Sequence, residues 1–288
     1  MPEVNSAVQD WLADHARRGC SPVAMVDAMV QVGFEQAFAD EAVHQALQAA
    51  AGYYTQAHYP HGFEALNDEY RYDPVPVAAG NVIRAHDRDI EVLVRCDRPQ
   101  VIVFGNVLSA DECAALIERA QPKLKRSTTV NPESGAEDIF PSRTSEGAFF
   151  QRGEDPFILN LEQRIAALMN WPVENGEGFQ VLNYRVGAEY TPHFDYFPPQ
   201  QAGSAVHTER GGNRVATMVL YLNDVPNGGA TYFPEAGISV AARQGRAVYF
   251  RYMNGYRQLD PLSLHGGAPV LVGEKWIMTK WVRERAAG

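Results

Sequence analysis

The stretch Tyr190-Thr191-Pro192-His193-Phe194-Asp195-Tyr196-Phe197 carries the strongest signal in this chain. On a β-strand, side chains alternate between the two faces, so residues at i and i+2 point the same way. This spacing predicts that His193 and Asp195 present an imidazole and a carboxylate to a single point. A further candidate, His265, stands downstream in Ser263-Leu264-His265-Gly266-Gly267. Together the three side chains predict a metal site.

The residue types indicate which chemistry such a site would support. Two histidines and one carboxylate on one face of a metal are the ligands of non-haem Fe(II) oxygenases, and they leave positions open for a co-substrate and O₂. A 2-oxoacid bound there has a remote carboxylate, which needs a buried cation because an unpaired buried anion is costly. Lys275 fits this need, since it opens a strand-like segment whose alternation places Ile277, Thr279 and Trp281 on the same face. A lone His-x-Asp tripeptide occurs by chance, and a solvated edge lysine is the alternative for Lys275, but their joint occurrence favours an enzyme.

Composition and charge narrow the class of partner. The 288-residue chain has 25 Lys and Arg against 35 Asp and Glu, a formal net charge of −10. An acidic protein repels phosphate backbones, so we expect no nucleic-acid partner, whereas a neutral or basic peptide is compatible. No apolar run approaches the ~20 residues that span a bilayer, and the N-terminus lacks a secretory signal. We therefore expect a cytoplasmic protein without a membrane partner, in which Cys20, Cys96 and Cys113 are reduced thiols.

The chain is expected to have two parts, residues 1–77 and 78–288. In the first, three apolar stripes at helical spacing predict a compact helical bundle over residues 1 to about 50. Residues 51–77 are rich in Tyr, His, Pro and Gly and are interpreted as a linker against the main domain. Its His58 and His61 are interpreted as surface or packing histidines, because no third ligand lies nearby. The stripes are Val8, Trp11, Leu12 and Ala16; Val23, Met25, Val26, Met29 and Val30; and Phe38, Ala42, Val43 and Leu47.

The second part has the pattern of an α+β domain. A capping-box sequence at Ser109 opens one predicted helix, and another is expected near 157–169. Between them, residues 129–145 are predicted to form a mobile loop. Two helices followed by a run of short strands fit a sheet sandwich or barrel. The predicted strands are 90–94, 101–104, 180–185, 215–222, 231–233, 247–250 and 275–282.

Longer motifs around these positions make the sequence resemble the prolyl 4-hydroxylase-type branch of the Fe(II)/2-oxoglutarate-dependent dioxygenases. The resemblance covers roughly residues 99 to 284 and is far more specific than the three candidate ligands alone. It implies a double-stranded β-helix (jelly-roll) core with supporting helices for residues 78–288. Residues 1–77 match none of its catalytic motifs. The motifs are PQVIVFGNVLS (99–109), RTSEG (143–147), QVLNYRVGAEYTPHFDYF (180–197), GGATYFP (228–234) and HGGAPV (265–270).

Position by position, the resemblance implies a role for each matching residue. Iron is held by His193, Asp195 and His265, and the 2-oxoglutarate carboxylate by Lys275 with the hydroxyls of Tyr184 and Thr231. The loop around 129–145 resembles a lid over the peptide, and residues 200–207 are expected as a loop over the site. The implied cofactors are Fe(2+), 2-oxoglutarate and O2, with ascorbate as a further candidate reductant. Implied substrate-contacting residues are Tyr190, Arg214, Trp281, Arg143, Ser145 and Glu177.

The predicted activity is hydroxylation of an unactivated C–H bond, foremost 4-hydroxylation of proline in a peptide or protein. The same chemistry on a free amino acid or a small natural product is the first alternative. A non-catalytic β-helix binding module is a second, disfavoured because the three candidate ligands and Lys275 are all present. A zinc hydrolase with the same ligand types is a third, disfavoured because no H-E-x-x-H motif occurs. No oligomeric state follows from the sequence.

Overall fold

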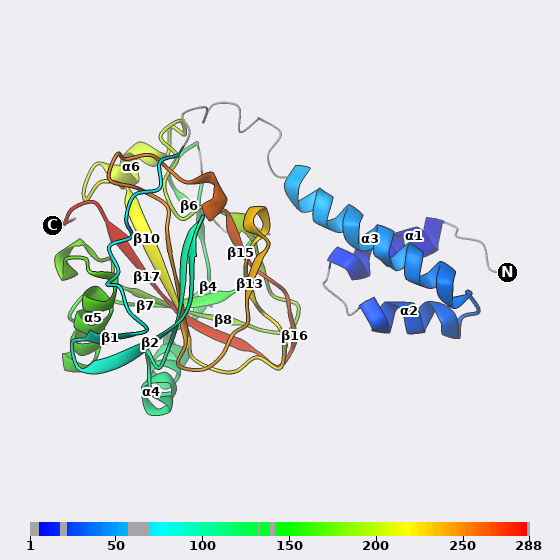
Figure 1. Cartoon of the computed structure of the whole chain (residues 1–288), viewed down its shortest axis with the longest axis horizontal. Coiled ribbons are helices and arrows are strands. Elements are labelled where there is room, and N and C mark those ends of the chain that lie inside the picture. The colour runs from blue at the N-terminus through cyan, green and yellow to red at the C-terminus, as the bar shows by residue number, and fades with distance from the viewer. Residues whose placement is uncertain (1–5, 18–21, 57–69, 132, 139–141, 287–288) are drawn as a thin grey trace. The chain divides into compact units, whose positions relative to one another are not determined.

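The computed structural model describes residues 6–17, 22–56, 70–131, 133–138 and 142–286. The chain divides into two compact units, Met1–Glu69 and Tyr70–Gly288 (Figure 1). Each unit has its own apolar core.

The N-terminal unit contains the predicted helices α1 (Ser6–Arg17), α2 (Pro22–Gln31) and α3 (Gln36–Gln56). Leu12, Met25, Met29 and Val43 are buried together, as their spacing predicts. Three details of the prediction were wrong. Val30, in the second predicted stripe, is 37% exposed. Phe38 is 44% exposed, because Phe34 from the preceding turn fills the core and Phe38 stacks on its ring from outside. Helix α3 also continues to residue 56, into the segment interpreted as linker; the predicted linker histidines lie outside the described residues.

The larger unit is built on a nine-stranded antiparallel sheet. Strands that are neighbours in this sheet are often far apart in the sequence. The two central strands, β10 and β17, pair directly, although the strands of a smaller sheet lie between them along the chain. In spatial order the strands are β1 (Val82–Ala85), β2 (Arg88–Asp97), β3 (Gln100–Gly105), β14 (Ala247–Arg251), β10 (Arg214–Tyr221), β17 (Lys275–Arg283), β8 (Phe179–Tyr184), β7 (Glu146–Phe150) and β4 (Lys125–Arg126).

A smaller four-stranded sheet packs against this one. Phe233 of the small sheet lies in one apolar cluster with Tyr221, Phe250 and Ile277 of the large sheet, so the two sheets enclose a common interior. Two short strands, β11 (Asn227–Gly228) and β16 (Val270–Val272), form a separate antiparallel pair. The arrangement is the predicted double-stranded β-helix, and the α+β fold class is confirmed. The small sheet has the order β13 (Ile238–Val240), β12 (Thr231–Phe233), β15 (His265–Gly267) and β9 (Tyr190–His193).

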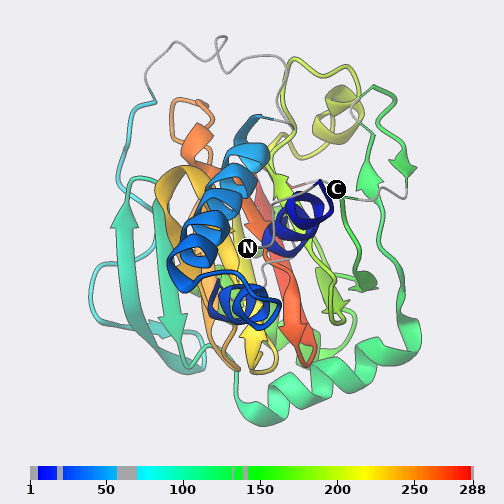
Figure 2. The ribbon, with the colours of Figure 1, turned by 90° about the vertical axis from the view of Figure 1, so that its right-hand side faces the viewer.

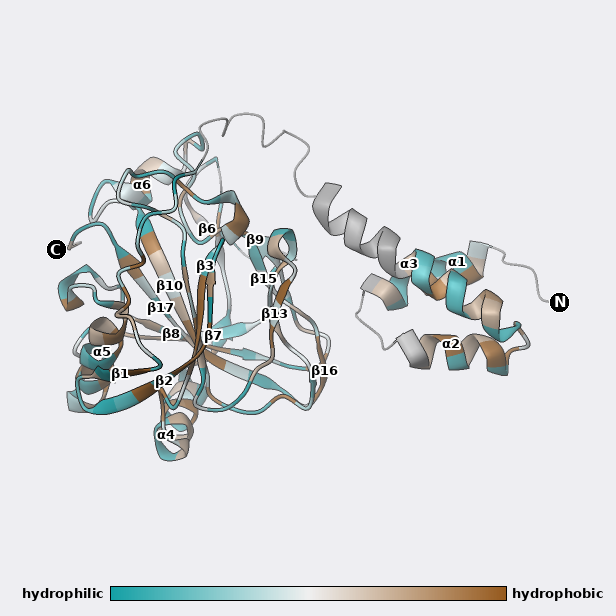
Figure 3. Cartoon of the chain, viewed as in Figure 1, coloured by the Kyte–Doolittle hydropathy of each residue, from teal (hydrophilic) through white to brown (hydrophobic). Residues whose placement is uncertain are grey.

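Helices α4 (Ala110–Ala120) and α5 (Pro156–Met169) cover the opposite face of the large sheet. Ser109 caps α4 with the predicted capping box. Because side chains alternate between the two faces of a strand, the large sheet contributes to two apolar clusters, one on each face. Along β17, Trp276 and Met278 pack with the helices, whereas Ile277 faces the interior between the sheets. Because both faces are covered, strands such as β3 are buried along their whole length, and β3 is apolar after Gln100 (Figure 3).

The segment 70–77 belongs structurally to the larger unit rather than to a linker. Tyr72 donates a hydrogen bond to Asp260, and Arg251 pairs with Asp73 at 2.6 Å. Val77 is buried in the cluster beneath the helices. The division therefore falls between residues 69 and 70, eight residues before the expected boundary.

Two segments expected as loops contain short elements. The 129–145 segment holds the antiparallel pair β5 (Thr129–Val130) and β6 (Glu137–Asp138), and helix α6 (Ser204–Thr208) lies in the segment expected over the site. Cys96 and Cys113 are free thiols, as predicted, and Cys20 lies outside the described residues. Among the helices of the described ranges, none is both long and apolar enough to cross a membrane.

Candidate metal centre and co-substrate site

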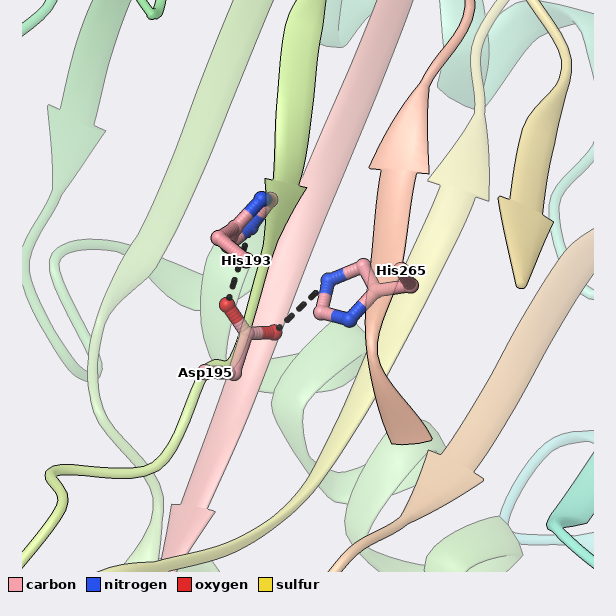
Figure 4. Close-up of side chains that lie close together, drawn as sticks. All are labelled: His193, Asp195 and His265. Carbon is pink, nitrogen blue, oxygen red and sulfur yellow. Dashed lines mark ion pairs between the residues drawn. The ribbon is translucent and has the colours of Figure 1, made fainter. Parts of the chain in front are cut away.

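The three predicted metal ligands lie together in the interior between the sheets. Strands β9 and β15 pair so that His193 and His265 are directly opposite each other, and their ring centroids are 4.4 Å apart. The Asp195 carboxylate reaches between them, 3.5 Å from Nε2 of His193 and 3.6 Å from Nε2 of His265 (Figure 4). One donor atom from each residue lies within 4.8 Å of the others.

The structure corrects one part of the geometric prediction. Strand β9 ends at His193, so Asp195 lies just beyond the strand rather than on it. Pairing with β15 stops at His193, and the chain then bends. The carboxylate therefore approaches the imidazoles from the bend, and cross-strand pairing, which the sequence pattern does not encode, brings His265 into place.

Backbone carbonyls orient both imidazoles. Nδ1 of His193 lies 2.9 Å from the Thr191 carbonyl oxygen, and Nδ1 of His265 lies 3.0 Å from that of Ser263. An Nδ1–H that donates to a carbonyl leaves the lone pair of Nε2 directed at the common point, which is how ligating histidines are held. Burial lowers the pKa of His265 to about 4, so this ring is neutral near pH 7.

Asp195 supplies the negative charge. Burial alone would raise the pKa of its carboxyl, but the neighbouring His265 and His193 outweigh this effect and hold it well below the usual range. The hydroxyl of Thr217, on β10 of the large sheet, donates to Oδ2 at 2.6 Å. Because that donation uses the only hydroxyl proton of Thr217, the 3.1 Å contact with Tyr252 has the tyrosine as donor. The carboxylate is therefore ionised and fixed in orientation.

We expect Thr217→Val to weaken metal binding by about 10–100-fold, because it removes the hydrogen bond that orients the Asp195 carboxylate while keeping the shape of the side chain. Titration with Co(II), followed by its visible absorption, measures the affinity without turnover. Thr217→Ser, which keeps the hydroxyl, is the matched control and should bind as the unaltered chain does. Equal affinities for the Val and Ser variants would contradict the assignment.

A buried ammonium lies beside this centre. Lys275, the first residue of β17, is 2% exposed. Its register partner on β8 is Tyr184, whose ring lies 5.4 Å from Nζ. Thr231 is opposite Gly267 across β12 and β15, and a Cβ added to Gly267 would lie 3.6 Å from the same Nζ. The three residues predicted for the co-substrate therefore surround one place.

In the part of the chain that the structure describes, no carboxylate balances the charge of Lys275. Within the described ranges its ammonium makes no hydrogen bond or ion pair with the protein, and burial lowers its pKa to about 7. Thr231 can also donate a hydrogen bond to a carboxylate. Tyr221 donates to Oγ1 of Thr231 at 2.9 Å, so the hydroxyl proton of Thr231 stays available. A buried cation and a free hydroxyl fit a carboxylate, and two imidazoles with one carboxylate fit a divalent metal.

This lowered pKa predicts a pH dependence for co-substrate binding. The free site carries the ammonium below pH 7 and loses it above, whereas a bound carboxylate would hold the proton on Lys275. The apparent affinity for 2-oxoglutarate should therefore fall by up to about tenfold per pH unit above 7. Calorimetric titration from pH 6 to 9 with a redox-inert metal measures it. A constant affinity over that range would contradict the role of Lys275.

Comparison with known proteins identifies this architecture. A model of the 2OG-Fe(II) oxygenase superfamily matches residues 179–283, the region that contains the candidate ligands and Lys275. Probable prolyl 4-hydroxylase 3 of Arabidopsis thaliana is 42% identical over 203 residues, which cover 64% of this chain and 69% of that protein. The chain belongs to the prolyl 4-hydroxylase-type Fe(II)/2-oxoglutarate-dependent dioxygenases.

Other members of the family support the same placement. Prolyl 4-hydroxylase subunit alpha-1 of Mus musculus is 39% identical over 189 residues, 66% of this chain and 35% of that one. The crystal structure of the viral collagen prolyl hydroxylase from Paramecium Bursaria Chlorella virus-1, a 2OG complex, has 27% identity and a TM-score of 0.50, covering 64% of this chain and 95% of that one. This chain is thus a 2-oxoglutarate-dependent dioxygenase, and its family requires Fe(2+), 2-oxoglutarate and O2.

The residues expected to contact substrate form two groups in this dioxygenase. In one, the Arg214 guanidinium lies 4.0 Å from the Trp281 ring and is held by Glu177 at 2.7 Å. In the other, Arg143 lies 4.9 Å from the Tyr190 ring and donates to Ser145. Tyr190 in turn stacks on His193, with ring centroids 3.6 Å apart. All six predicted residues are thus connected to one another or to a candidate ligand.

Sequence reasoning missed the hydroxyls behind the site. Thr217 orients Asp195, Tyr252 donates to Thr217, and Tyr221 donates to Thr231. A partial signal existed for two of them. Thr217 and Tyr221 share one face of strand β10, which is otherwise apolar after Arg214, and a buried hydroxyl there needs a partner. No such sequence signal marks Tyr252. It follows β14 and lies near Thr217 only because β14 pairs with β10 in the sheet.

Proposed function

We propose that this dioxygenase is a prolyl 4-hydroxylase that acts on a proline-containing segment of a peptide or protein. The observation that carries the proposal is the cluster of His193, Asp195 and His265 beside the buried ammonium of Lys275, all inside one jelly-roll interior. The relatives that match the chain at about 40% identity bear the names of prolyl 4-hydroxylases.

His193, Asp195 and His265 would hold the iron. Two neutral imidazoles and one carboxylate reduce the charge of a divalent ion to a single positive charge and leave other positions free. The bound iron supplies the coupling of O2 reduction to oxidative decarboxylation of 2-oxoglutarate, so that one oxygen atom enters the C–H bond of the substrate and the other enters succinate, with release of CO2. Thr217 and the two carbonyls hold the ligands in orientation.

Lys275, Thr231 and Tyr184 would receive the distal carboxylate of 2-oxoglutarate. The ammonium supplies the charge, and the two hydroxyls supply donors. Burial of this group inside the jelly roll excludes water from the carboxylate, so a dicarboxylate of the right length is held with its other end toward the metal ligands. Ascorbate remains a candidate reductant in this proposal.

Trp281, Arg214 and Tyr190 would position the substrate. The indole Nε1 of Trp281 is buried without a hydrogen-bond partner in the part of the chain that the structure describes, and such a donor suits a carbonyl oxygen of a peptide. Arg214 donates to the backbone oxygen of Asp195 at 3.2 Å, which connects the proposed substrate residues directly to a ligand. Main-chain carbonyls occur in every peptide, so this arrangement favours a polypeptide over a free amino acid.

Fe(II)-dependent conversion of 2-oxoglutarate to succinate, with and without a proline-rich peptide, tests the proposal. We expect peptide-stimulated turnover, one added oxygen atom per modified proline, and 4-hydroxyproline on amino-acid analysis. Turnover that no proline peptide stimulates would indicate that the substrate is a small molecule. Turnover no higher than that of His265→Ala would contradict catalysis itself and favour a binding module.

A further inference from the structure

The turn that precedes the ligand His265 begins at a buried carboxyl group. Asp260 is the N-cap of the short 3-10 turn η5 (Pro261–Ser263), and its Oδ1 accepts from the backbone nitrogen of Leu262 at 2.9 Å. Aspartate followed by proline suits this position, because aspartate caps free N–H groups and proline has none to cap. The backbone oxygen of Asp260 accepts from Ser263 twice, from its nitrogen at 3.2 Å and from its hydroxyl at 2.6 Å. Asp260 therefore holds both ends of the turn.

This turn sets the orientation of the His265 ring. Nδ1 of His265 lies 3.0 Å from the Ser263 carbonyl oxygen, and both residues are buried. A carbonyl that accepts from Nδ1 determines where Nε2 points, so a shift of the turn would rotate the imidazole away from Asp195. The orientation of this ligand thus depends on Asp260 through one intermediate residue, Ser263.

A second path leads from Asp260 to the carboxylate ligand. The backbone nitrogen of Asp260 donates to the carbonyl oxygen of Tyr252 at 2.8 Å. The hydroxyl of Tyr252 donates to Thr217, which in turn donates to Asp195. Asp260 and Tyr252 close the two ends of the loop 252–260, so the position of this loop affects the supports of both ligands.

The segment 70–73, at the start of the larger unit, braces the loop 252–260. The hydroxyl of Tyr72 donates to Oδ1 of Asp260 at 3.2 Å. Figure 2 shows the segment, in cyan, beside the orange turn of the loop. None of its residues lies in the region 179–283 that the family model matches. The remaining hydrogen bonds between segment and loop join Arg71 to Gln258 and Asn254, and Asp73 to Gly255.

The burial of Asp260 needs a reason. The residue is 0% exposed and, among the residues that the structure describes, it forms no ion pair and its Oδ2 accepts no hydrogen bond. Burial raises the pKa of the carboxyl to about 6, and a buried carboxyl without a cation is costly. The bonds that Oδ1 accepts from Leu262 and Tyr72 are therefore what the side chain contributes.

We propose that Asp260 is a positioning residue for the metal ligand His265, and that Tyr72 holds Asp260 in this role. Together they keep the Ser263 carbonyl aimed at Nδ1 of His265, so that Nε2 stays directed at the common point of the three ligands. This role concerns the iron site, so it applies whichever molecule the dioxygenase hydroxylates.

Asp260→Ala and Asp260→Asn separate the oxygen from the rest of the side chain. Alanine removes the acceptor for Leu262 and Tyr72. Asparagine, an equally good N-cap, keeps Oδ1, and its amide nitrogen replaces an oxygen that has no partner to lose in the described ranges. We expect the Co(II) affinity, followed by visible absorption, to fall about tenfold or more in Asp260→Ala and to stay within about twofold in Asp260→Asn.

Tyr72→Phe tests the segment and removes only a hydroxyl, because the edge contact of the ring with Tyr70 remains. We expect the Co(II) affinity to fall about fivefold, the effect of one hydrogen bond. Tyr256→Phe is the matched control, since Tyr256 lies in the same loop but is 65% exposed, and it should bind Co(II) as the unaltered chain does. If Asp260→Ala does not fold, the comparison of these two variants decides the inference.

Nitrogen-15 NMR of the metal-free protein separates positioning from a general loss of stability. We expect one tautomer of His265 in the unaltered chain, with its proton on Nδ1, and both tautomers in Asp260→Ala; the signals are assigned by their loss in His265→Ala. Ser109→Ala removes the N-cap of α4 on the far face of the sheet, so it should lower stability without changing the tautomer or the Co(II) affinity.

Unchanged Co(II) affinity or a single His265 tautomer in Asp260→Ala would show that the ring keeps its orientation, and Asp260 would then be only a structural cap. Unchanged affinity in Tyr72→Phe would overturn the role of the segment. Neither readout depends on turnover, so a failure to hydroxylate proline would refute the proposed function and leave this inference standing on its own measurements.

Discussion

Lys275→Met is expected to raise KM for 2-oxoglutarate by about 100-fold or more, because it leaves the buried distal carboxylate without a cation. The same substitution should make the protein more stable. The ammonium of Lys275 is buried and, within the described residues, unpaired, so an apolar side chain of similar volume removes a desolvation cost of about 1–3 kcal/mol. Denaturant unfolding and steady-state kinetics in 2-oxoglutarate measure the two effects.

The stabilisation has a defined pH dependence. Burial lowers the pKa of Lys275 from its ordinary value of 10.5 to about 7, so between these two pH values the unfolded chain binds more protons at this residue than the folded chain. The destabilising contribution of Lys275 is therefore complete below pH 7 and is relieved as the pH rises toward 10.5. The advantage of the Met variant over the unaltered chain should shrink across that window.

Lys280→Met is the matched control, since it alters a second buried lysine in the same strand. Nζ of Lys280 pairs with Glu162 at 2.8 Å, and both side chains are buried. Its removal leaves a buried carboxylate without a partner and should cost about 3–5 kcal/mol. If both variants were destabilised alike, the ammonium of Lys275 would have a structural partner and the co-substrate role would be wrong.

His265→Ala is expected to lower kcat/KM by more than about 1,000-fold, because loss of a ligand exceeds the 10–100-fold typical of residues that only orient one. The imidazole is buried, with its Nε2 3.6 Å from Asp195, and alanine offers no atom that could bind a metal in its place. Succinate formation measures the loss, and Co(II) titration shows whether metal affinity falls with it.

His86→Asn provides the control for this experiment. His86 is an exposed histidine at φ 52°, a conformation that asparagine tolerates, and it should keep full activity. If His265→Ala bound metal and turned over as His86→Asn does, the assignment of His265 as a ligand would fail.

Much of the fold could be predicted because local signals agreed with the tertiary result. The capping box at Ser109 marks the start of α4, and alternation along β17 correctly separates Ile277 from its neighbours. Local signals failed where tertiary packing decided. Phe38 fits a helical stripe but is exposed, because Phe34 fills the same space from a turn. Residues 70–77 resemble a linker by composition, yet side-chain bonds to Arg251 and Asp260 fix them to the larger unit.

The sequence by itself determined the chemistry of the site: the types of ligand at 193, 195 and 265, and the need for a lysine near them. These follow from what a metal and a carboxylate require and are readable in short motifs. Only the tertiary structure decided which other residues hold these side chains in place. Thr217 and Tyr221 donate hydrogen bonds to residues that lie on other strands or loops of the fold. Such contacts depend on strand register and backbone approach, which no local pattern of residues specifies.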